Sequence, residues 1–340
     1  MIAFASPGAR RLARASATAL CALAGGTVAR ADTPRNTPAA IEVDRDSVPA
    51  GRVGFGFDGG EPVDAWGVSS AVGWIERPIE LKAGAFGAAT PASRPVRRRQ
   101  TLTLGGALAL GDRLVLDAAV RGSHQIGDRL HAAGDPAALA RYVFHDLRIG
   151  GRIRFAGDRD RAALLRVDLA LPSGNADQLA GDARSTLAWQ LIGRATLPRR
   201  VVIAGSAGVR FHRAEIAVGD QLVGDELFAA AGVAVPVSAA GELGAERMVV
   251  TAELHGAYGD HVGKLAGPSP LEAQIGLIGR PLAAFAIGTR IGVGLDDAIG
   301  APSIRAVLEL AWTPRIAVAD RPAPAPPPPQ DDEPDDDATR

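Results

Sequence analysis

The sequence has few aromatic residues, a single cysteine and almost no excess charge. Aromatic residues make up 4% of the 340 residues, and 37 Lys plus Arg nearly balance 38 Asp plus Glu, for a net charge of −1. Nucleic acid binding needs a concentrated basic surface, and intrinsic disorder needs high net charge with few apolar residues. With 47% hydrophobic residues, we expect a folded protein that binds no nucleic acid.

Long apolar runs are also missing. A membrane-spanning helix needs about 20 consecutive apolar residues. The longest uncharged stretch after the N-terminal region runs only from Leu227 to Gly241 and contains Pro236. Glycine is abundant instead, with 41 residues, and the basic residues are almost all arginine. This composition predicts an all-β chain.

The N-terminal region has the three parts of an export signal. A basic region is followed by an uncharged run from Ala15 to Ala29, and residues 29–31 (Ala-Arg-Ala) form a small-x-small cleavage pattern. We predict that residues 1–31 are a removable signal peptide and that cleavage falls between Ala31 and Asp32.

The single cysteine, Cys21, lies inside that apolar run. Lipoprotein processing needs a small residue just before the cysteine, and Leu20 stands there instead. The mature chain is therefore expected to have no cysteine and no disulfide framework.

Apolar and polar side chains alternate in segments from about residue 97 onward. Between Arg161 and Leu171, for example, Val167 and Leu169 fall on one face and Arg166 and Asp168 on the other. Period-two alternation indicates β-strands whose two faces meet different surroundings. The same pattern occurs at Asp146–Ala156, Met248–His255 and Ser303–Thr313.

Short and longer connectors alternate along the chain. The short connectors are at residues 111–112, 157–160, 198–199, 237–245 and 281–282, and the longer ones at 123–144, 172–184, 213–222, 259–269 and 294–302. Short turns at one end and longer loops at the other are typical of outer-membrane barrels, whereas a soluble β-sandwich usually has strands of about five or six residues. The sequence predicts an antiparallel transmembrane outer-membrane β-barrel.

The strand count and the domain limits follow from this pattern. Eleven strands between residues 97 and 313 and one at about Asp64–Ile75 give 12, an even number, as closure with both ends on the periplasmic side requires. If Ile79–Ala88 and Gly51–Phe57 are also strands, the count becomes 14, and the expected range is 10–14. We expect residues 32–60 to be an N-terminal lead-in, 61–315 the barrel and 316–340 a proline-rich, acidic periplasmic tail.

Three stretches resemble the barrel half of certain OmpA-family outer-membrane proteins. They are Arg97–Val120, with Gly-Ala-Leu-Ala-Leu-Gly-Asp-Arg-Leu-Val-Leu, Arg166–Ser185, with Asp-Leu-Ala-Leu-Pro-Ser-Gly-Asn-Ala-Asp, and Ser269–Pro314. The resemblance covers about residues 60–315 and implies a barrel in the outer membrane. In that family a peptidoglycan-binding domain commonly follows a linker. This sequence ends at Arg340 just after the linker, so we expect the barrel without that domain.

Motifs that would support catalysis or cofactor binding are absent from the sequence. The segment from Gly54 to Gly59 has the G-x-G-x-x-G spacing, but Glu61-Pro62-Val63 offers no helix start for a dinucleotide. No two histidines have the His-x-x-x-His spacing of a zinc helix. The sequence contains neither the His-x-Ser pair of outer-membrane phospholipase barrels nor a Gly-x-Ser-x-Gly elbow. We expect no enzyme, no cofactor and no metal.

Charged residues recur on the less apolar faces of the strands. A lipid-facing arginine at the membrane midplane costs about 2–4 kcal/mol, so these residues are expected to line the lumen. They are Asp117, Arg148, Arg152, Arg154, Arg166, Asp168, Arg194, Arg210, Glu253, Glu272, Arg290, Arg305 and Glu309. The charges either pair into a network that closes the barrel or line a water-filled route, and we predict a narrow, charge-lined lumen.

One group of arginines favours the open route. Four of them, Arg148, Arg152, Arg154 and Arg166, have only Asp146 and Asp168 as near counter-charges by sequence, an excess of two (4 − 2). Arginine stays charged at any accessible pH. Water beside an unpaired basic cluster predicts a preference for anions. Residues 97–99 (Arg-Arg-Arg) are expected at the external rim, either bound to lipid phosphates or in a solvated loop.

These observations favour a passive small-solute pore or transporter-like channel in the outer membrane of a Gram-negative-type envelope. The alternative is a structural outer-membrane protein with a closed, charge-paired lumen. The low aromatic content supports a third possibility, a soluble periplasmic β-sandwich that binds a ligand. The expected partners are outer-membrane lipid, including lipopolysaccharide, and small solutes. The solute and the oligomeric state stay open.

Overall fold

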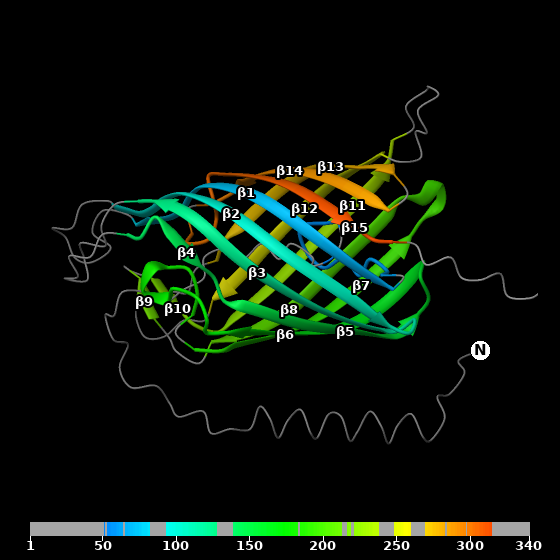
Figure 1. Ribbon diagram of the computed structural model, residues 1–340, viewed down its shortest axis with the longest axis horizontal. Coiled ribbons are helices and arrows are strands. Elements are labelled where there is room, and N and C mark those ends of the chain that lie inside the picture. The colour runs from blue at the N-terminus through cyan, green and yellow to red at the C-terminus, as the bar shows by residue number, and fades with distance from the viewer. Residues whose placement is uncertain are drawn as a thin grey trace, which may run out of the picture.

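Twelve antiparallel strands form a closed barrel in the computed structural model (Figure 1). The structure describes residues 51, 53–63, 65–81, 93–127, 139–182, 184–212, 216–218, 221–237, 248–259, 269–282, 284–296 and 298–314. The barrel strands are β1 (Trp66–Leu81), β2 (Ser93–Leu110), β3 (Leu114–Ile126), β5 (Leu147–Gly157), β6 (Arg161–Leu171), β7 (Thr186–Thr196), β8 (Val202–His212), β11 (Glu226–Pro236), β12 (Met248–Gly259), β13 (Leu271–Leu282), β14 (Phe285–Gly294) and β15 (Ile304–Trp312).

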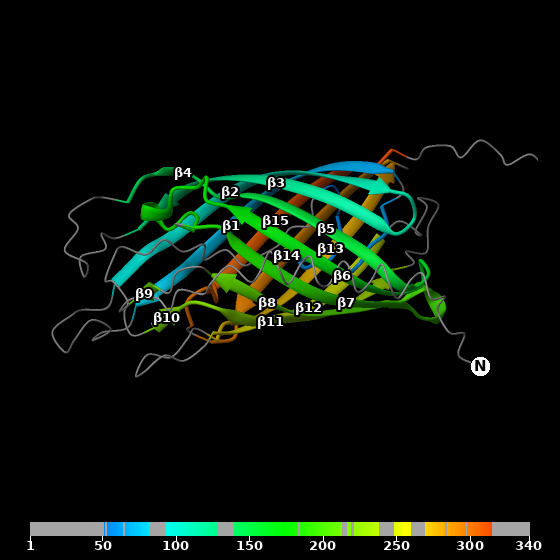
Figure 2. The same cartoon turned by 90° about the horizontal axis from the view of Figure 1, so that it is seen from below.

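Each barrel strand pairs with the next along the chain, and β1 closes the sheet on β15. The register of that closure runs from Val68 opposite Trp312 to Glu76 opposite Ile304. A short strand, β4 (Tyr142–Phe144), extends the pairing of β3 beyond β5. The views in Figures 1 and 2 show the strands crossing the long axis obliquely, as closure of a barrel requires. A single closed sheet excludes the β-sandwich alternative.

The two ends of the barrel differ. The end that we call the turn end carries the short connections after β2, β5, β7 and β13, and the β7–β8 turn is a 3-10 helix, η3 (Pro198–Arg200). The opposite end, the loop end, carries β4 and the hairpin of β9 (Ile216–Val218) and β10 (Gln221–Val223), at the left of Figure 1. Another 3-10 helix, η2 (Ala176–Gln178), lies in the β6–β7 loop. This arrangement agrees with the expected alternation of short and long connectors.

The β5–β6 connection, at the turn end, is a tight turn. Gly157 has φ +80°, and a side chain there would place its Cβ 1.7 Å from the carbonyl oxygen of Arg161. Asp158 Oδ1 accepts the backbone N–H groups of Asp160 at 2.8 Å and Arg161 at 2.9 Å. These bonds, that of Arg161 first, lower the pKa of the Asp158 carboxyl below its ordinary value. Only glycine fits at position 157.

The outer face of the barrel is apolar. Strand residues alternate between the faces, and the outward positions are occupied by exposed aliphatic side chains such as Val72, Leu102, Ile153, Leu191, Ile275, Ile291 and Leu308. Aromatic side chains lie toward both ends. At the turn end Trp66 and Phe285 pack against Trp312, and at the loop end Tyr142 and Phe144 are more than two-thirds exposed. An aliphatic band between aromatic rows is the outer surface of a membrane barrel.

The structure decides the strand count in favour of 12. Within the described residues, neither of the two extra segments weighed for a count of 14 adds a barrel strand, and residues 82–88 lie outside the described ranges. Residues 79–81 belong to β1, which has a register shift after Glu76, and the described residues between Gly51 and Phe57 lie inside the barrel. Among the described residues, no helix is long and apolar enough to cross a membrane. The predicted signal peptide, its cleavage site between Ala31 and Asp32, and residues 316–340 fall outside the described ranges.

Candidate functional site

The candidate site is the lumen, and the thirteen charged residues expected there all lie on its side of the wall. Six are less than a tenth exposed: Arg152, Glu253, Glu272, Arg290, Arg305 and Glu309. Five others line a cavity inside the barrel, as Glu272 also does: Asp117, Arg148, Arg166, Asp168 and Arg210. Arg194 lies near Glu61, in the chain before β1. Arg154 binds Asp112 at the turn end with an Nη2–Oδ2 distance of 3.2 Å.

The chain before β1 occupies the lumen. Gly51 donates its backbone N–H to Ser69 Oγ at 2.8 Å near the turn end, and residues 53–61 then pass through the interior before β1 begins at Trp66. We call residues 53–61 the lumen segment. Its position was not foreseen, because the sequence predicted residues 32–60 to be a lead-in, with Gly51–Phe57 as an alternative barrel strand. The G-x-G-x-x-G spacing from Gly54 to Gly59 therefore belongs to an extended chain inside a barrel.

The first half of the lumen segment is apolar. Val53 packs with Ile278, Ala286 and Ala311 of the β13–β15 wall. Phe55 and Phe57 stack at a centroid distance of 5.1 Å and pack on small residues of β8 and β11, Ala204 and Ala234. These three side chains are 4% exposed or less.

Small residues on the wall make room for the two rings. A Cβ at position 232 of β11 would lie 2.8 Å from the Phe55 ring, so the wall needs glycine there. Wall side chains also bind the backbone of this half. Gly56 donates its N–H to Glu253 Oε2 at 2.7 Å, and Arg290 donates to the carbonyl oxygen of Gly54 at 3.2 Å.

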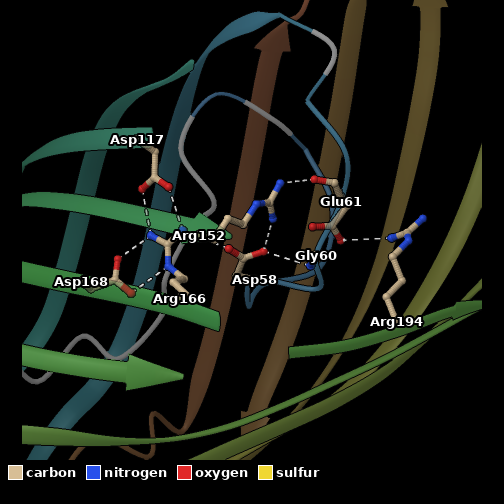
Figure 3. Close-up of polar contacts among 8 residues, drawn as sticks. All are labelled: Asp58, Gly60, Glu61, Asp117, Arg152, Arg166, Asp168 and Arg194. Atoms are coloured by element: carbon tan, nitrogen blue, oxygen red, sulfur yellow. Dashed lines mark hydrogen bonds and ion pairs between the residues drawn. The ribbon is translucent and has the colours of Figure 1, made fainter. Parts of the chain in front are cut away.

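The second half of the lumen segment is acidic and faces arginines (Figure 3). Asp58 Oδ1 accepts hydrogen bonds from Arg152 Nη1 at 2.5 Å and from the N–H of Gly60 at 2.9 Å, and Asp58 Oδ2 accepts one from Arg166 Nη1 at 2.9 Å. One carboxylate thus bridges arginines of two neighbouring strands. Arg152 also donates to the carbonyl oxygen of Glu61, whose carboxylate lies 4.0 Å from Arg194 Nη1.

Arg166 binds two further carboxylates from the wall. Asp117 on β3 accepts two bonds from its Nη atoms, at 2.7 and 2.8 Å, and Asp168 accepts Nε at 2.7 Å. The expectation that the arginine cluster exceeds its counter-charges by two is therefore wrong, because Asp58 and Asp117 supply carboxylates that are distant in sequence. Asp146 has a further role in the loop after β6. Its carboxylate accepts the backbone N–H groups of Gly174 and Asp182 and orders the β6–β7 loop.

Ion pairs also cross between strands elsewhere on the wall. Arg290 on β14 binds Glu309 on β15 at 2.5 Å, and Arg305 on β15 binds Glu272 on β13 at 2.8 Å. Arg210 on β8 pairs with Glu226 on β11 and lies over the Phe228 ring. Burying a charged side chain without a partner costs free energy. Cross-strand pairing offsets this cost and explains why these residues can be buried in a narrow lumen.

A cavity with both charged and apolar lining residues opens above the lumen segment, toward the loop end. Its volume, open to the centres of water molecules, is about 150 Å³. Phe57 and Asp58 are the only lumen-segment residues in its lining, so the segment forms its floor. The charged lining of the described walls consists of four arginines and six carboxylates: Arg121, Arg148, Arg166, Arg210, Asp117, Asp146, Asp168, Asp182, Glu226 and Glu272. Three hydroxyl-bearing residues (Thr103, Thr186 and Ser206) and Gln190 also line it.

The three consecutive arginines at 97–99 separate from one another. Arg97 is exposed near the loop end. Arg98 faces outward, with its guanidinium 4.5 Å from the Trp74 ring centre and 3.1 Å from Glu76. Arg99 is fully buried and donates to Gln125 Oε1 at 2.8 Å and to the carbonyl oxygen of Leu179 at 2.7 Å. The expectation that all three lie at the rim is wrong for Arg99, which fastens the β6–β7 loop to the wall.

Sequence reasoning also missed a buried serine–histidine contact. Ser123 Oγ on β3 and His145 Nε2, between β4 and β5, are 2.6 Å apart. The two residues are 22 positions apart, so no local motif marks them. Asp58 and Glu61 had one usable signal, since Val53, Phe55 and Phe57 alternate with Gly54 and Gly56 just before them.

The fold and the lumen define a closed 12-stranded barrel of the outer-membrane class. Among the residues the structure describes, no group of His, Cys, Asp and Glu is placed to hold a metal ion.

No protein-family model matches the sequence, and the curated protein sequences contain no match.

Solved structures do resemble the chain. A crystal structure of an outer membrane channel from Pseudomonas putida F1 superposes with a TM-score of 0.55 and 13% identity, covering 77% of this chain and 99% of that chain. The KdgM porin (TM-score 0.44, 8% identity) and the NanC porin (0.47, 5%) each align over 73% of this chain and 99% of theirs. At these identities the likeness concerns the fold.

Proposed function

We propose that the protein is an outer-membrane channel through which small solutes pass passively. The observation that carries the proposal is the cavity, lined in part by charged and hydroxyl side chains, inside a barrel whose outer face is apolar. A solute that enters from the loop end meets arginines, carboxylates and hydroxyl groups, whereas lipid meets mainly aliphatic and aromatic side chains. A purely structural barrel has no need for an accessible polar interior.

The lumen segment sets the state of this channel. Its side chains are almost fully buried at mid-height, and the cavity ends at Phe57 and Asp58. Contacts with wall side chains hold the segment at this level, and it is not part of the hydrogen-bonded strand ladder. It can therefore undock without disturbing that ladder. We therefore assign the described arrangement to the closed channel and the undocked segment to the open one.

The paired charges favour a second candidate, the structural barrel with a closed lumen. Bilayer recordings of the purified barrel, with and without residues 53–61, separate the two. A channel gives intermittent conductance in the intact protein and larger, steadier conductance in the shortened one. Folded, heat-modifiable protein that conducts in neither form would show that the barrel is closed by its wall and not by the segment.

The same proposal covers location and partners. We expect export by residues 1–31, a mature chain that begins at Asp32, and contact of the outer face with outer-membrane lipid, including lipopolysaccharide near Arg97 and Arg98. The resemblance to the OmpA-family barrel is part of the proposal, and the short connections at the turn end support it. Cell fractionation with mass spectrometry tests it: an intact Met1 or a lipid on Cys21 would contradict export by this route.

We also infer that the protein is not an enzyme. Ser123 and His145 have the spacing of a nucleophile and base, but they are 6% and 4% exposed. A substrate cannot reach either atom in this arrangement. Incubation with phospholipid or an activated ester should release no product, and turnover that is lost in Ser123→Ala would overturn this inference.

A further inference from the structure

We propose that Arg152 and Arg166 form a binding site for a small hydroxylated monocarboxylate and that Asp58 occupies this site in the closed channel. The inference rests on the proposed function for its biological meaning, but its chemistry depends only on the lumen contacts. Figure 3 shows the Asp58 carboxylate between the two guanidinium groups.

The geometry is that of a bound carboxylate. Each oxygen of Asp58 takes one charged donor, at 2.5 Å from Arg152 and 2.9 Å from Arg166. The donors come from neighbouring strands, β5 and β6, where Arg152 and Arg166 stand directly opposite each other. The rigid ladder fixes the two guanidinium groups, whereas Asp58 belongs to the lumen segment, outside the ladder. Charge-assisted hydrogen bonds of this kind are among the strongest in proteins.

The balance of charge selects a monoanion. Arg152 and Arg166 contribute two positive charges, and Asp58, Asp117 and Asp168 contribute three negative ones, which leaves −1. A monocarboxylate that replaces Asp58 keeps that balance, whereas a phosphate dianion adds one more negative charge to a buried site. The internal occupant and its replacement then have the same charge and the same donor pattern.

A solute can reach this site from the loop end. Asp58 and Arg166 both line the cavity, so an incoming carboxylate meets Arg166 before it displaces Asp58 and gains Arg152. The cavity wall beside them carries Thr103, Thr186 and Gln190, which can donate to or accept from hydroxyl groups. A carboxylate with several hydroxyl groups fits this lining better than an apolar acid.

Competition with an internal group has a measurable signature. The apparent association constant of a ligand is its intrinsic association constant multiplied by the fraction of protein whose site is free. Neutralising Asp58 should raise that fraction, so Asp58→Asn is expected to bind the solute at least tenfold more tightly than the unaltered chain. Removing the donors in Arg152→Gln or Arg166→Gln should abolish binding.

Isothermal titration calorimetry of the detergent-folded, heat-modifiable protein with sodium gluconate tests this directly. Sorbitol, which lacks the carboxylate, is the matched ligand and should not bind. The matched variant is Asp112→Asn, which removes a carboxylate from another arginine of β5, Arg154, outside the cavity, and leaves the Arg152–Arg166 site occupied. It should change gluconate affinity less than twofold. Asp58→Ala provides a second test, because asparagine retains a hydrogen-bonding oxygen.

The outcomes separate this inference from the channel proposal. Gluconate affinity that is equal in the unaltered chain, Asp58→Asn and Asp58→Ala would overturn the site, as would equal binding of sorbitol. Titration needs no transport, so tight binding to Asp58→Asn in a protein that never conducts would support the site and contradict the channel. Conductance without the affinity gain would do the reverse.

Discussion

The outer and inner faces of β6 place opposite demands on neighbouring residues. Leu169 points to lipid and is 36% exposed, while Arg166 and Asp168 point inward and bind each other and residues of other elements. An outward side chain contacts the hydrocarbon of the lipid, so any aliphatic side chain is accommodated at such a position. On the inside each charge needs a specific partner at hydrogen-bond distance. The outer face is therefore tolerant and the inner face specific.

The largest expected effect comes from placing a charge on the tolerant face. Leu169→Arg puts a guanidinium into hydrocarbon and should lower the free energy of unfolding by about 2–4 kcal/mol if it lies near the midplane, less toward the rim. Ala170→Arg is the matched control, because Ala170 is adjacent in sequence and lines the cavity. Urea unfolding in lipid vesicles measures both. Equal losses in the two variants would show that the faces are assigned wrongly.

The next effect concerns a specific contact on the inner face. Ser123→Ala removes the bond to His145 and should cost about 1–3 kcal/mol, because a buried ring nitrogen then loses its partner. Ser206→Ala is the matched control. Its hydroxyl is also buried but has no hydrogen-bond partner among the described residues. Urea unfolding should show little change for Ser206→Ala, and an equal loss in both would contradict the role of the Ser123–His145 bond.

The comparison also explains how much could be predicted from the sequence. Alternation predicts the outer face and the inward direction of Arg152 or Glu309, because strand geometry repeats every two residues. It does not predict partners. Asp58 lies 94 residues from Arg152 and 108 from Arg166, and no local pattern links positions so far apart. The same limit hid the lumen segment, whose docking depends on small wall residues such as Gly232.

A smaller effect is expected at the turn end, outside both faces. The N–H groups of Arg161 and Asp160 hold the pKa of Asp158 below its ordinary value of 3.8, so the ionised form is favoured by folding. Its stabilisation is complete above pH 3.8 and disappears as the pH falls through the lower, folded-state pKa. Asp158→Asn should therefore be less stable than the unaltered chain at neutral pH, with a gap that closes in acid. A gap that widens in acid would contradict this assignment.

The most direct test of the account locks the lumen segment in place. A Cβ at position 288 would lie 2.5 Å from Val53 Cγ1, so Val53→Cys with Gly288→Cys, in a chain with Cys21→Ala, should form a disulfide between the segment and β14. Planar-bilayer conductance is then recorded on the same protein before and after reduction, with each single-cysteine variant as a control. The account predicts no conductance in the oxidised protein and its appearance on reduction. Equal conductance in both states, with the disulfide verified by mass spectrometry, would contradict it.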